Sequence, residues 1–554
     1  DAQESRGLGD VYKRQALYHM ADSSYCFPVS DNELVLRLRT AKNDIKDVSV
    51  LYESKYIIGG CQKKQNMEKQ FSDSLYDYYV TKLLLTDTRV GYVFYINDGK
   101  DKYYYSEDGL TETYDFKQGF YNFFQYPYIN PVDVMSKVDW MGKACFYQIF
   151  VDRFKQGIAH KGISYINCEW GDIPSPFTHA GGDLKGITEK LDYIKSLGCN
   201  VIYLTPVFKS KSNHKYDISD YYEIDEQFGT NEDLHELVET AHGKNMKIVL
   251  DAVFNHCSED IMQFRDVCEK GKNSKYYIWF IIHGDSVNAD RDNYEIFGGC
   301  KYMPKWNTGN ESAAEYLINI AVHYLKAYDI DGWRLDVSDE VSHAFWREFR
   351  KAVKKCRKDA IILGENWHNA YSNLRGDQFD GIMNYSFTKA CLDYFAYDKF
   401  TAGKFSDRLN EILMRNTDIV NYMMLNLLDS HDTHRFYSEV SCNDFRFEAA
   451  ICLTYMFPGA PCIFYGTEIR MEGGYDPDCR RCMDWDKKDD RMKTLLNALS
   501  ELRKKYEIAD GSVSIYSRDE NFMLEIVTKK HKIILEINKE TEKYGISVDG
   551  GNYI

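Results

Sequence analysis

Acidic residues stand at the ends of four short apolar runs in this sequence. They are Asp251, Asp336, Glu365 and Asp432. Carboxylates gathered in one place serve two common chemistries. Glycosidic cleavage needs one ionised and one protonated carboxyl group, whereas metal-assisted hydrolysis needs side chains that hold an ion. The metal reaction would require more histidines at ligand spacing than these runs contain, so the sequence favours glycosidic cleavage.

The neighbours of two of these acids indicate opposite protonation states. Arg334 precedes Asp336 by two residues, and on a strand that spacing places both side chains on one face. The guanidinium is then positioned to keep Asp336 ionised. Glu365 lies beside apolar residues and near Trp367, a setting that raises a carboxyl pKa. A single acid such as Asp251 is more often a helix cap or a turn residue, so the prediction depends on the whole set.

Strands must position these carboxylates, and after residue 140 apolar runs alternate with amphipathic helices. Thr230 and Asp233 form a capping-box pattern at the start of one helix, and Gly243 ends it. Eight strands separated by helices predict an α/β fold, a (β/α)8 TIM barrel, whose active site lies at the carboxyl ends of the strands. The eight runs are Cys145–Val151, Val201–Pro206, Lys247–Val253, Asp331–Val337, Ile361–Glu365, Gly381–Phe387, Met423–Asp429 and Pro461–Gly466.

Four segments are predicted along the chain. Residues 1–15 fit no element and are interpreted as a non-native or disordered leader. Alternating strands and turn signals predict an N-terminal β-sandwich over 16–130. The barrel occupies 131–507, and the connection 256–310 is too long for a simple loop, so it is predicted to be an inserted subdomain. Strand patterns return in a small C-terminal β domain over 508–554.

Composition excludes some classes of partner. Against 69 Lys and Arg the chain has 85 Asp and Glu, a net charge of −16, which argues against nucleic acid and anionic membranes. Aromatic residues make up 15% of the chain, which would suit a sugar ligand but is also explained by core and strand residues. The 15 cysteines lack a disulfide framework spacing and indicate a reducing compartment, the cytoplasm. There is no run of 18 apolar residues, so no membrane span is predicted.

Four motifs give the chain a specific resemblance. They are Asp251-Ala-Val-Phe-Asn-His256, Gly332-Trp-Arg-Leu-Asp-Val337 followed by Glu340, Gly364-Glu-Asn-Trp-His368, and Ser430-His-Asp432. In this order and on these strands they resemble the α-amylase superfamily of glycoside hydrolases. Within it the chain looks like the neopullulanase, cyclomaltodextrinase and maltogenic amylase group, although Trp306 stands where that group's motif has leucine.

The resemblance implies a role for each motif residue. Asp336 would be the nucleophile, Glu365 the general acid/base and Asp432 a third carboxylate that favours the distorted sugar ring. It also implies substrate-binding residues: Asp251, Asn255, His256, Arg334, Glu340, Trp367, His431, the ring of Tyr216 as a sugar platform, and Phe297. The implied enzyme is a retaining α-glucan hydrolase acting on cyclomaltodextrins, maltodextrins and pullulan, with transglycosylation as a side reaction.

Alternatives and additional ligands follow from the same resemblance. An oligo-1,6-glucosidase or transglucosylase would usually lack the N-terminal domain, and an inactive amylase-like binding subunit would lack the carboxylates. Relatives dimerise through the N-terminal domain, so a homodimer is expected. No cofactor is required, but relatives often hold a structural Ca²⁺ near Gly181 and Asp183. The loop after Arg153 lacks the expected oxygen ligands, and Ca²⁺ needs six to eight.

Overall fold

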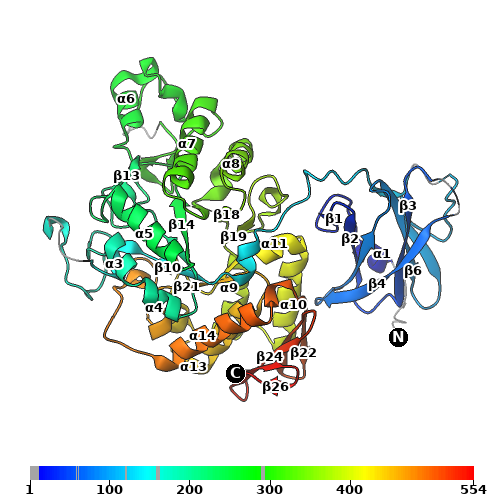
Figure 1. Ribbon diagram of the computed structural model, residues 1–554. Coiled ribbons are helices and arrows are strands. Elements are labelled where there is room, and N and C mark those ends of the chain that lie inside the picture. The colour runs from blue at the N-terminus through cyan, green and yellow to red at the C-terminus, as the bar shows by residue number, and fades with distance from the viewer. Residues whose placement is uncertain (1–10, 58, 60, 119–121, 158–162, 289–292) are drawn as a thin grey trace. The chain divides into compact units, whose positions relative to one another are not determined.

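The computed structural model describes residues 11–57, 59, 61–118, 122–157, 163–288 and 293–554 (Figure 1). The chain forms two compact units. The larger comprises residues 138–398 and 422–511, and the smaller comprises the residues up to 137 together with 399–421 and 512–554. Part of the predicted barrel segment, residues 399–421, therefore belongs with the two β domains.

Eight parallel strands form the barrel of the larger unit, in the order β19-β18-β17-β14-β11-β10-β21-β20. A parallel bridge between Met383 and Leu425 joins the two ends of this order, which confirms the predicted TIM barrel. The strands are largely buried, which explains why they read as continuous apolar runs. They are β10 (Phe146–Ile149), β11 (Val201–Leu204), β14 (Lys247–Ala252), β17 (Gly332–Leu335), β18 (Ile361–Gly364), β19 (Gly381–Ile382), β20 (Leu425–Leu427) and β21 (Ala460–Phe464).

The sixth strand is much shorter than the predicted run Gly381–Phe387. It ends at Ile382, and helix α9 (Tyr385–Cys391) begins three residues later. The Asn384 side chain caps that helix by accepting from the Phe387 backbone N–H, so the apolar residues after it are helical. Gly381 is required at the strand, because a Cβ there would come within 2.2 Å of the Met423 carbonyl oxygen.

Helices alternate with these strands as expected (Figure 1). Helix α5 (Asn231–Gly243) has the complete capping box formed by Thr230 and Asp233. The helices of this unit, besides α5 and α9, are α2 (Val151–Phe154), α3 (Leu184–Glu189), α4 (Leu191–Ser196), α6 (Met262–Lys270), α7 (Glu311–Ala327), α8 (His343–Cys356), α12 (Phe436–Glu439), α13 (Asp444–Met456) and α14 (Asp490–Lys505).

Two antiparallel hairpins accompany the barrel strands. β12 (Phe208–Ser210) pairs with β13 (Ile218–Ile224), and β15 (Ile296–Phe297) pairs with β16 (Cys300–Pro304) in the long segment after β14. Trp306 is buried in that segment. Its ring stacks on Phe280 at 4.9 Å, and its indole N–H donates to the Tyr221 hydroxyl at 3.2 Å. The tryptophan that departs from the family motif therefore serves as a core residue.

The N-terminal β domain of the smaller unit has an antiparallel path β1-β2-β5-β4-β3-β6-β7-β8, with β9 beside β6. Strand β4 lies between the half of this path that contains β1, β2 and β5 and the half that contains β3, β6, β7 and β8. Its residues 63–67 pair with β3, and its residues 68–72 pair with β5. The two halves of this domain thus share a strand. The strands are β1 (Cys26–Ser30), β2 (Glu33–Ala41), β3 (Asp47–Ser54), β4 (Lys63–Ser72), β5 (Tyr76–Leu84), β6 (Val90–Asn97), β7 (Lys102–Ser106), β8 (Gly109–Thr111) and β9 (Phe124–Tyr126).

The smaller unit also contains helix α10 (Ala402–Met414) and the C-terminal sheet. That sheet comprises β22 (Ser512–Arg518), β23 (Asn521–Val527), β24 (Lys532–Asn538), β25 (Lys543–Val548) and β26 (Gly551–Asn552). The Asn410 amide joins three elements by donating to the Ser72 carbonyl at 2.8 Å and the Ile515 carbonyl at 3.0 Å. Helix α11 (Asp418–Met423) follows α10.

The predicted leader falls partly on helix α1 (Val11–Ala16), so its last residues are helical. Residues 1–10 of that leader lie outside the described residues.

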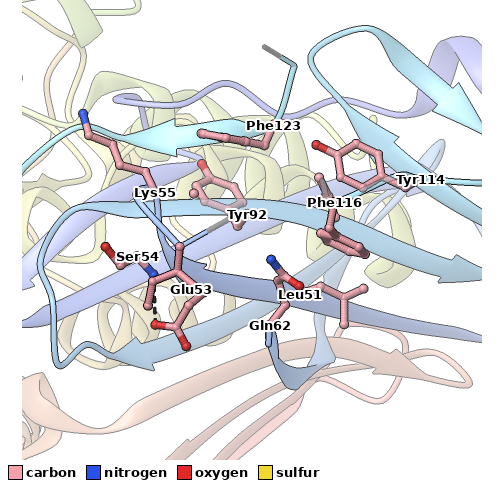
Figure 2. A pocket seen from close by; sticks show the side chains of 12 residues that line it. Leu51, Glu53, Ser54, Lys55, Gln62, Tyr92, Tyr114, Phe116 and Phe123 are labelled. Atoms are coloured by element: carbon pink, nitrogen blue, oxygen red, sulfur yellow. Dashed lines mark hydrogen bonds between the residues drawn. The ribbon is translucent and has the colours of Figure 1, made fainter. Parts of the chain in front are cut away.

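A small pocket lies beside β6 in the N-terminal domain (Figure 2). The Phe123 ring covers Gly91, where a Cβ would lie 2.9 Å from the ring. A cavity volume of about 30 Å³ admits one or two water molecules and is too small for a sugar ring. Tyr103 is buried in the domain core.

Candidate active site

Arg334 is the centre of the charged cluster at the barrel rim. It lies on β17 and is fully buried. Its Nη1 donates to Asp336 Oδ1 at 2.7 Å and to both oxygens of Asp251 at 3.0 Å, and its Nη2 lies 2.9 Å from Glu365 Oε2. A single guanidinium therefore holds three of the four predicted strand-end carboxylates. Arg334 lies beside Asp336, as the alternation of side chains along a strand predicts.

The protonation of Asp336 and Glu365 is set by two opposing influences. Burial raises the pKa of Asp336 well above its ordinary range and also raises the pKa of Glu365. The positive charge of the Arg334 guanidinium opposes both shifts, because it lowers the pKa of each acid. One cation cannot support three ionised carboxylates in a buried site, so this cluster favours a state in which one carboxyl group keeps its proton. Asp336 has the shorter contact with Arg334 and is the better candidate for the ionised acid.

The backbone after Asp336 is bent sharply toward Glu365. Val337 adopts a left-handed conformation with φ of 43°, which is rare for a β-branched residue. In that conformation its N–H donates to Glu365 Oε2 at 2.9 Å. Strain of this kind persists only when the surroundings impose it, and such strain clusters at functional sites.

A second group of residues extends the cluster toward Asp432. Tyr216 donates its hydroxyl proton to Asp251 at 3.0 Å, and its ring is parallel to that of His431 with centroids 5.5 Å apart. His431 Nε2 lies 3.1 Å from Asp432 Oδ2. Arg480 Nη2 donates to the other oxygen of Asp432 at 3.1 Å. The fourth carboxylate is therefore connected to the first three through Tyr216 and His431.

Asn255 and Glu340 meet at a neighbouring part of the rim. The Asn255 amide donates to Glu340 Oε2 at 3.3 Å, and Lys305 Nζ binds the same carboxylate oxygen at 2.9 Å. Lys305 also donates to the Asn255 side-chain oxygen. Lys305 thus contributes a cation to this pair.

Two ring pairs supply flat surfaces beside the acids. The His256 ring stacks on Phe297 with centroids 4.4 Å apart, and Trp367 stacks on Tyr385 at 3.8 Å. Trp367 is 44% exposed, so part of its surface remains open. Burial lowers the pKa of His256 to about 3, and its Nε2 lacks a hydrogen-bond partner among the described residues. His256 is therefore a neutral, buried ring beside the cluster.

Gly181 and Asp183 do not join this cluster. The Asp183 carboxylate caps α3 by accepting from the Gly186 N–H at 2.7 Å, and it also accepts from the Gly157 N–H at 3.1 Å. N–H groups occupy the directions in which a cation would sit, so this donor set does not fit Ca²⁺. The loop after Arg153 includes residues 158–162, which lie outside the described residues.

Several residues of the cluster were not predicted. The Tyr203 hydroxyl on β11 donates to Asp251 Oδ2 at 2.7 Å, and Gln148 on β10 contacts His431. Gln148 is a polar residue inside an apolar run, and that interruption is the signal that could have identified it. Arg480 ends a short 3-10 helix (Asp478–Arg480) after β21, where the sequence carries no comparable signal.

Comparisons with known proteins agree with this geometry. The family profile described as "Alpha amylase, catalytic domain" matches residues 148–533, and "Alpha amylase, N-terminal ig-like domain" matches residues 12–130. The chain belongs to the α-amylase family. A cyclomaltodextrinase of Thermoanaerobacter pseudethanolicus is 40% identical to this chain over 537 residues. The match covers 96% of this chain and 93% of the relative. Neopullulanase 2 of Thermoactinomyces vulgaris is 40% identical over 481 residues, covering 86% and 81%.

Solved structures place the family member in the same group. A structure described as cyclomaltodextrinase has a TM-score of 0.90 and 36% identity and covers 95% of this chain and 91% of that chain. A cyclic alpha-maltosyl-(1→6)-maltose hydrolase from Arthrobacter globiformis has a TM-score of 0.71 and 34% identity, covering 73% and 92%. The prediction of an α-amylase-type glycoside hydrolase, of the cyclomaltodextrinase and neopullulanase group, is confirmed. Within the described residues, no helix is long and apolar enough to cross a membrane.

Proposed function

We propose that this glycoside hydrolase cleaves α-1,4-glucosidic bonds with retention of configuration in cyclomaltodextrins, maltodextrins and pullulan, and that it also accepts α-1,6 bonds. The contact of Arg334 with both Asp336 and Glu365 carries the proposal. Oxygens bound to neighbouring nitrogens of one guanidinium are close together. That favours the retaining separation of about 5–5.5 Å over the wider gap that an inverting enzyme leaves for water.

The first half of the reaction assigns each acid one task. Glu365 gives its proton to the glycosidic oxygen that leaves, and ionised Asp336 attacks the anomeric carbon. The product of this step is a β-glucosyl ester of Asp336. Arg334 stabilises the carboxylate before the attack, and Asp432 favours the distorted sugar ring.

The second half reverses the proton transfer. Glu365, now ionised, removes a proton from water, and the water oxygen attacks the anomeric carbon, breaking its bond to Asp336 and releasing the Asp336 carboxylate. Two inversions give a product with the original α configuration. A sugar hydroxyl in place of water gives transglycosylation, and the half-exposed Trp367 is positioned to hold such an acceptor.

Relatives support the choice of substrate and location. The names cyclomaltodextrinase, maltogenic alpha-amylase and neopullulanase belong to proteins about 40% identical to this chain. An intracellular maltogenic amylase of Bacillus subtilis is 38% identical. All fifteen cysteines of this chain are free thiols. We therefore assign the enzyme to the cytoplasm. We also propose a homodimer through the N-terminal domain, which light scattering would refute by showing a monomer at micromolar concentration.

Product analysis tests the proposal. Purified enzyme is incubated separately with cyclomaltodextrin, pullulan and soluble starch, and the first products are followed by NMR at the anomeric proton. We expect α-anomers first and faster turnover of cyclomaltodextrin than of starch. Asp336→Asn is the matched control and should retain less than about a hundredth of the activity, because loss of the nucleophile costs several kcal/mol of barrier. A β-anomer as first product would contradict the retaining mechanism.

A further inference from the structure

Gln148 contacts the side of His431 that faces away from Asp432. Gln148 lies on β10, and both side chains are fully buried. The Gln148 Nε2 atom is 2.8 Å from His431 Nδ1. An amide can donate or accept at such a contact, so the neighbours of the other ring nitrogen decide which occurs.

The other ring nitrogen of His431 faces groups that need a donor. His431 Nε2 lies 3.1 Å from Asp432 Oδ2 and 2.6 Å from the Tyr216 oxygen. A carboxylate can only accept, and the Tyr216 hydroxyl proton is used in the bond to Asp251 at 3.0 Å. Nε2 must therefore carry a hydrogen.

His431 is also held in its neutral form. Burial lowers its pKa well below the ordinary range, and the positive charges of Arg480 and Arg334 lower it further. A neutral imidazole has one N–H, so Nδ1 bears a lone pair and Gln148 must donate to it. The groups that face His431 from the packed elements are the Tyr216 phenol, the Asp432 carboxylate, the imidazole of His214, the guanidinium groups of Arg334 and Arg480, and the Cys479 thiol.

We propose that Gln148 is a positioning residue that fixes His431 as the Nε2–H tautomer, so that this N–H faces the Tyr216 oxygen and the Asp432 carboxylate. The proposal deepens the proposed function and rests on it for the role of His431. The donor chain then runs from Gln148 to His431, to Tyr216 and finally to Asp251, which Arg334 also binds.

The acceptor end of Gln148 is the cost of this direction. Its Oε1 is buried and has no hydrogen-bond partner among the described residues. With the amide reversed, Gln148 Oε1 would accept from His431 Nδ1–H, and the lone pair of His431 Nε2 would face the Asp432 carboxylate. In that arrangement His431 no longer donates a hydrogen bond from Nε2 to Asp432 or to the Tyr216 oxygen. One unpartnered acceptor is the smaller loss.

Nitrogen NMR of enzyme labelled in its histidine rings reads the tautomer directly. The 14 histidines are resolved by comparison with a His431→Asn variant, which identifies the His431 signals by their loss. We expect the Nε2–H pattern from pH 5 to 9 in the wild type. In Gln148→Met, which keeps the side-chain length but cannot donate, we expect a mixture of tautomers and kcat/KM about tenfold lower.

His19 supplies an internal control in the same spectra. Its Nδ1 lies 2.8 Å from the Arg37 carbonyl oxygen, which can only accept, and its Nε2 lies 2.8 Å from the Tyr92 hydroxyl. Burial lowers its pKa to about 4. His19 should therefore show the opposite, Nδ1–H pattern and should not respond to any change at Gln148.

Gln148→Glu adds a kinetic test. A carboxylate at this position accepts from Nδ1, so Nε2–H survives only in the imidazolium form. We expect the alkaline limb of the kcat/KM profile on cyclomaltodextrin to move at least one pH unit lower in Gln148→Glu and to stay in place in Gln148→Met. Coincident limbs in the two variants would overturn the proposal. An Nδ1–H or imidazolium pattern for wild-type His431 would overturn it as well. Lack of α-glucan turnover by the wild type would instead refute the proposed function, since the spectra need no substrate.

Discussion

Replacing Arg334 by methionine removes the cation shared by Asp251, Asp336 and Glu365. The substitution keeps an unbranched, buried side chain and deletes the charge. An opposite charge at hydrogen-bond distance lowers a carboxyl pKa by about 1–3 units. Since one unit corresponds to about 1.4 kcal/mol, each carboxylate loses on the order of 1–4 kcal/mol of support for its ionised form. The two contacts of 2.7 and 2.9 Å place Asp336 and Glu365 in this range.

The expected result is a shift of the acid limb of the kcat/KM profile to higher pH. Burial already raises the pKa of both acids, and Arg334 is the main influence against it. Its loss raises both pKa values further, so less Asp336 is ionised at a given pH. A rise of about two units reduces the reactive fraction on the acid side roughly a hundredfold. The profile of kcat/KM reports groups of the free enzyme, so this shift is visible without a bound-state measurement.

Arg350→Met is the matched control for this experiment. Arg350 binds the buried carboxylate of Asp380 at 2.8 Å, in the same barrel but outside the cluster at the rim. Its loss should lower stability and leave the acid limb in place. Arg334→Lys, which keeps a charge but loses the planar fork, should give an intermediate limb. An acid limb in Arg334→Met that coincides with the wild type, in protein with a native circular dichroism spectrum, would refute the reasoning.

Three further substitutions test other parts of the molecule. Glu365→Gln should reduce kcat on maltodextrin about 10²–10⁴-fold, and much less on a glucoside whose leaving group needs no proton; equal losses on both would contradict the general-acid role. Asp331 is buried against Lys247 and Arg357, and its pKa is lowered by the surrounding hydrogen bonds and charges despite burial. Its stabilisation is therefore present above the unfolded pKa of about 3.9 and is lost as pH falls through the lower folded value. Asp331→Asn should lower the free energy of unfolding at pH 7 by about 2 kcal/mol, and a difference from the wild type that stays constant down to pH 3 would contradict this. Thr230→Ala should cost about 1 kcal/mol in the same assay, through the lost cap of α5.

The sequence by itself determined the barrel and the residues at its rim. Strand runs, helix periodicity and the cap at Thr230 are local patterns, and each strand places its last polar residue at the same edge. The spacing of Arg334 and Asp336 is also local, because alternate residues of a strand share a face. These features need no knowledge of distant contacts, so they could be predicted.

Local patterns did not locate the sixth strand correctly, and they did not show which groups the Asp183 carboxylate binds. Gly381–Phe387 looks like one apolar run, but the Asn384 cap makes its second half helical. Asp183 belongs to a motif that implies an ion, yet N–H groups of Gly157 and Gly186 occupy its carboxylate. In both cases a side chain binds the backbone, and periodicity does not record that choice.

The tertiary structure alone decided which groups control the acids. Arg334 contacts three carboxylates at the ends of three different strands. His431 forms a hydrogen bond with Gln148, which lies 283 residues earlier in the chain. Burial and the charges of neighbours then set the proton on each group. Those influences depend on distances between residues far apart in sequence, so they exist only once the barrel has closed.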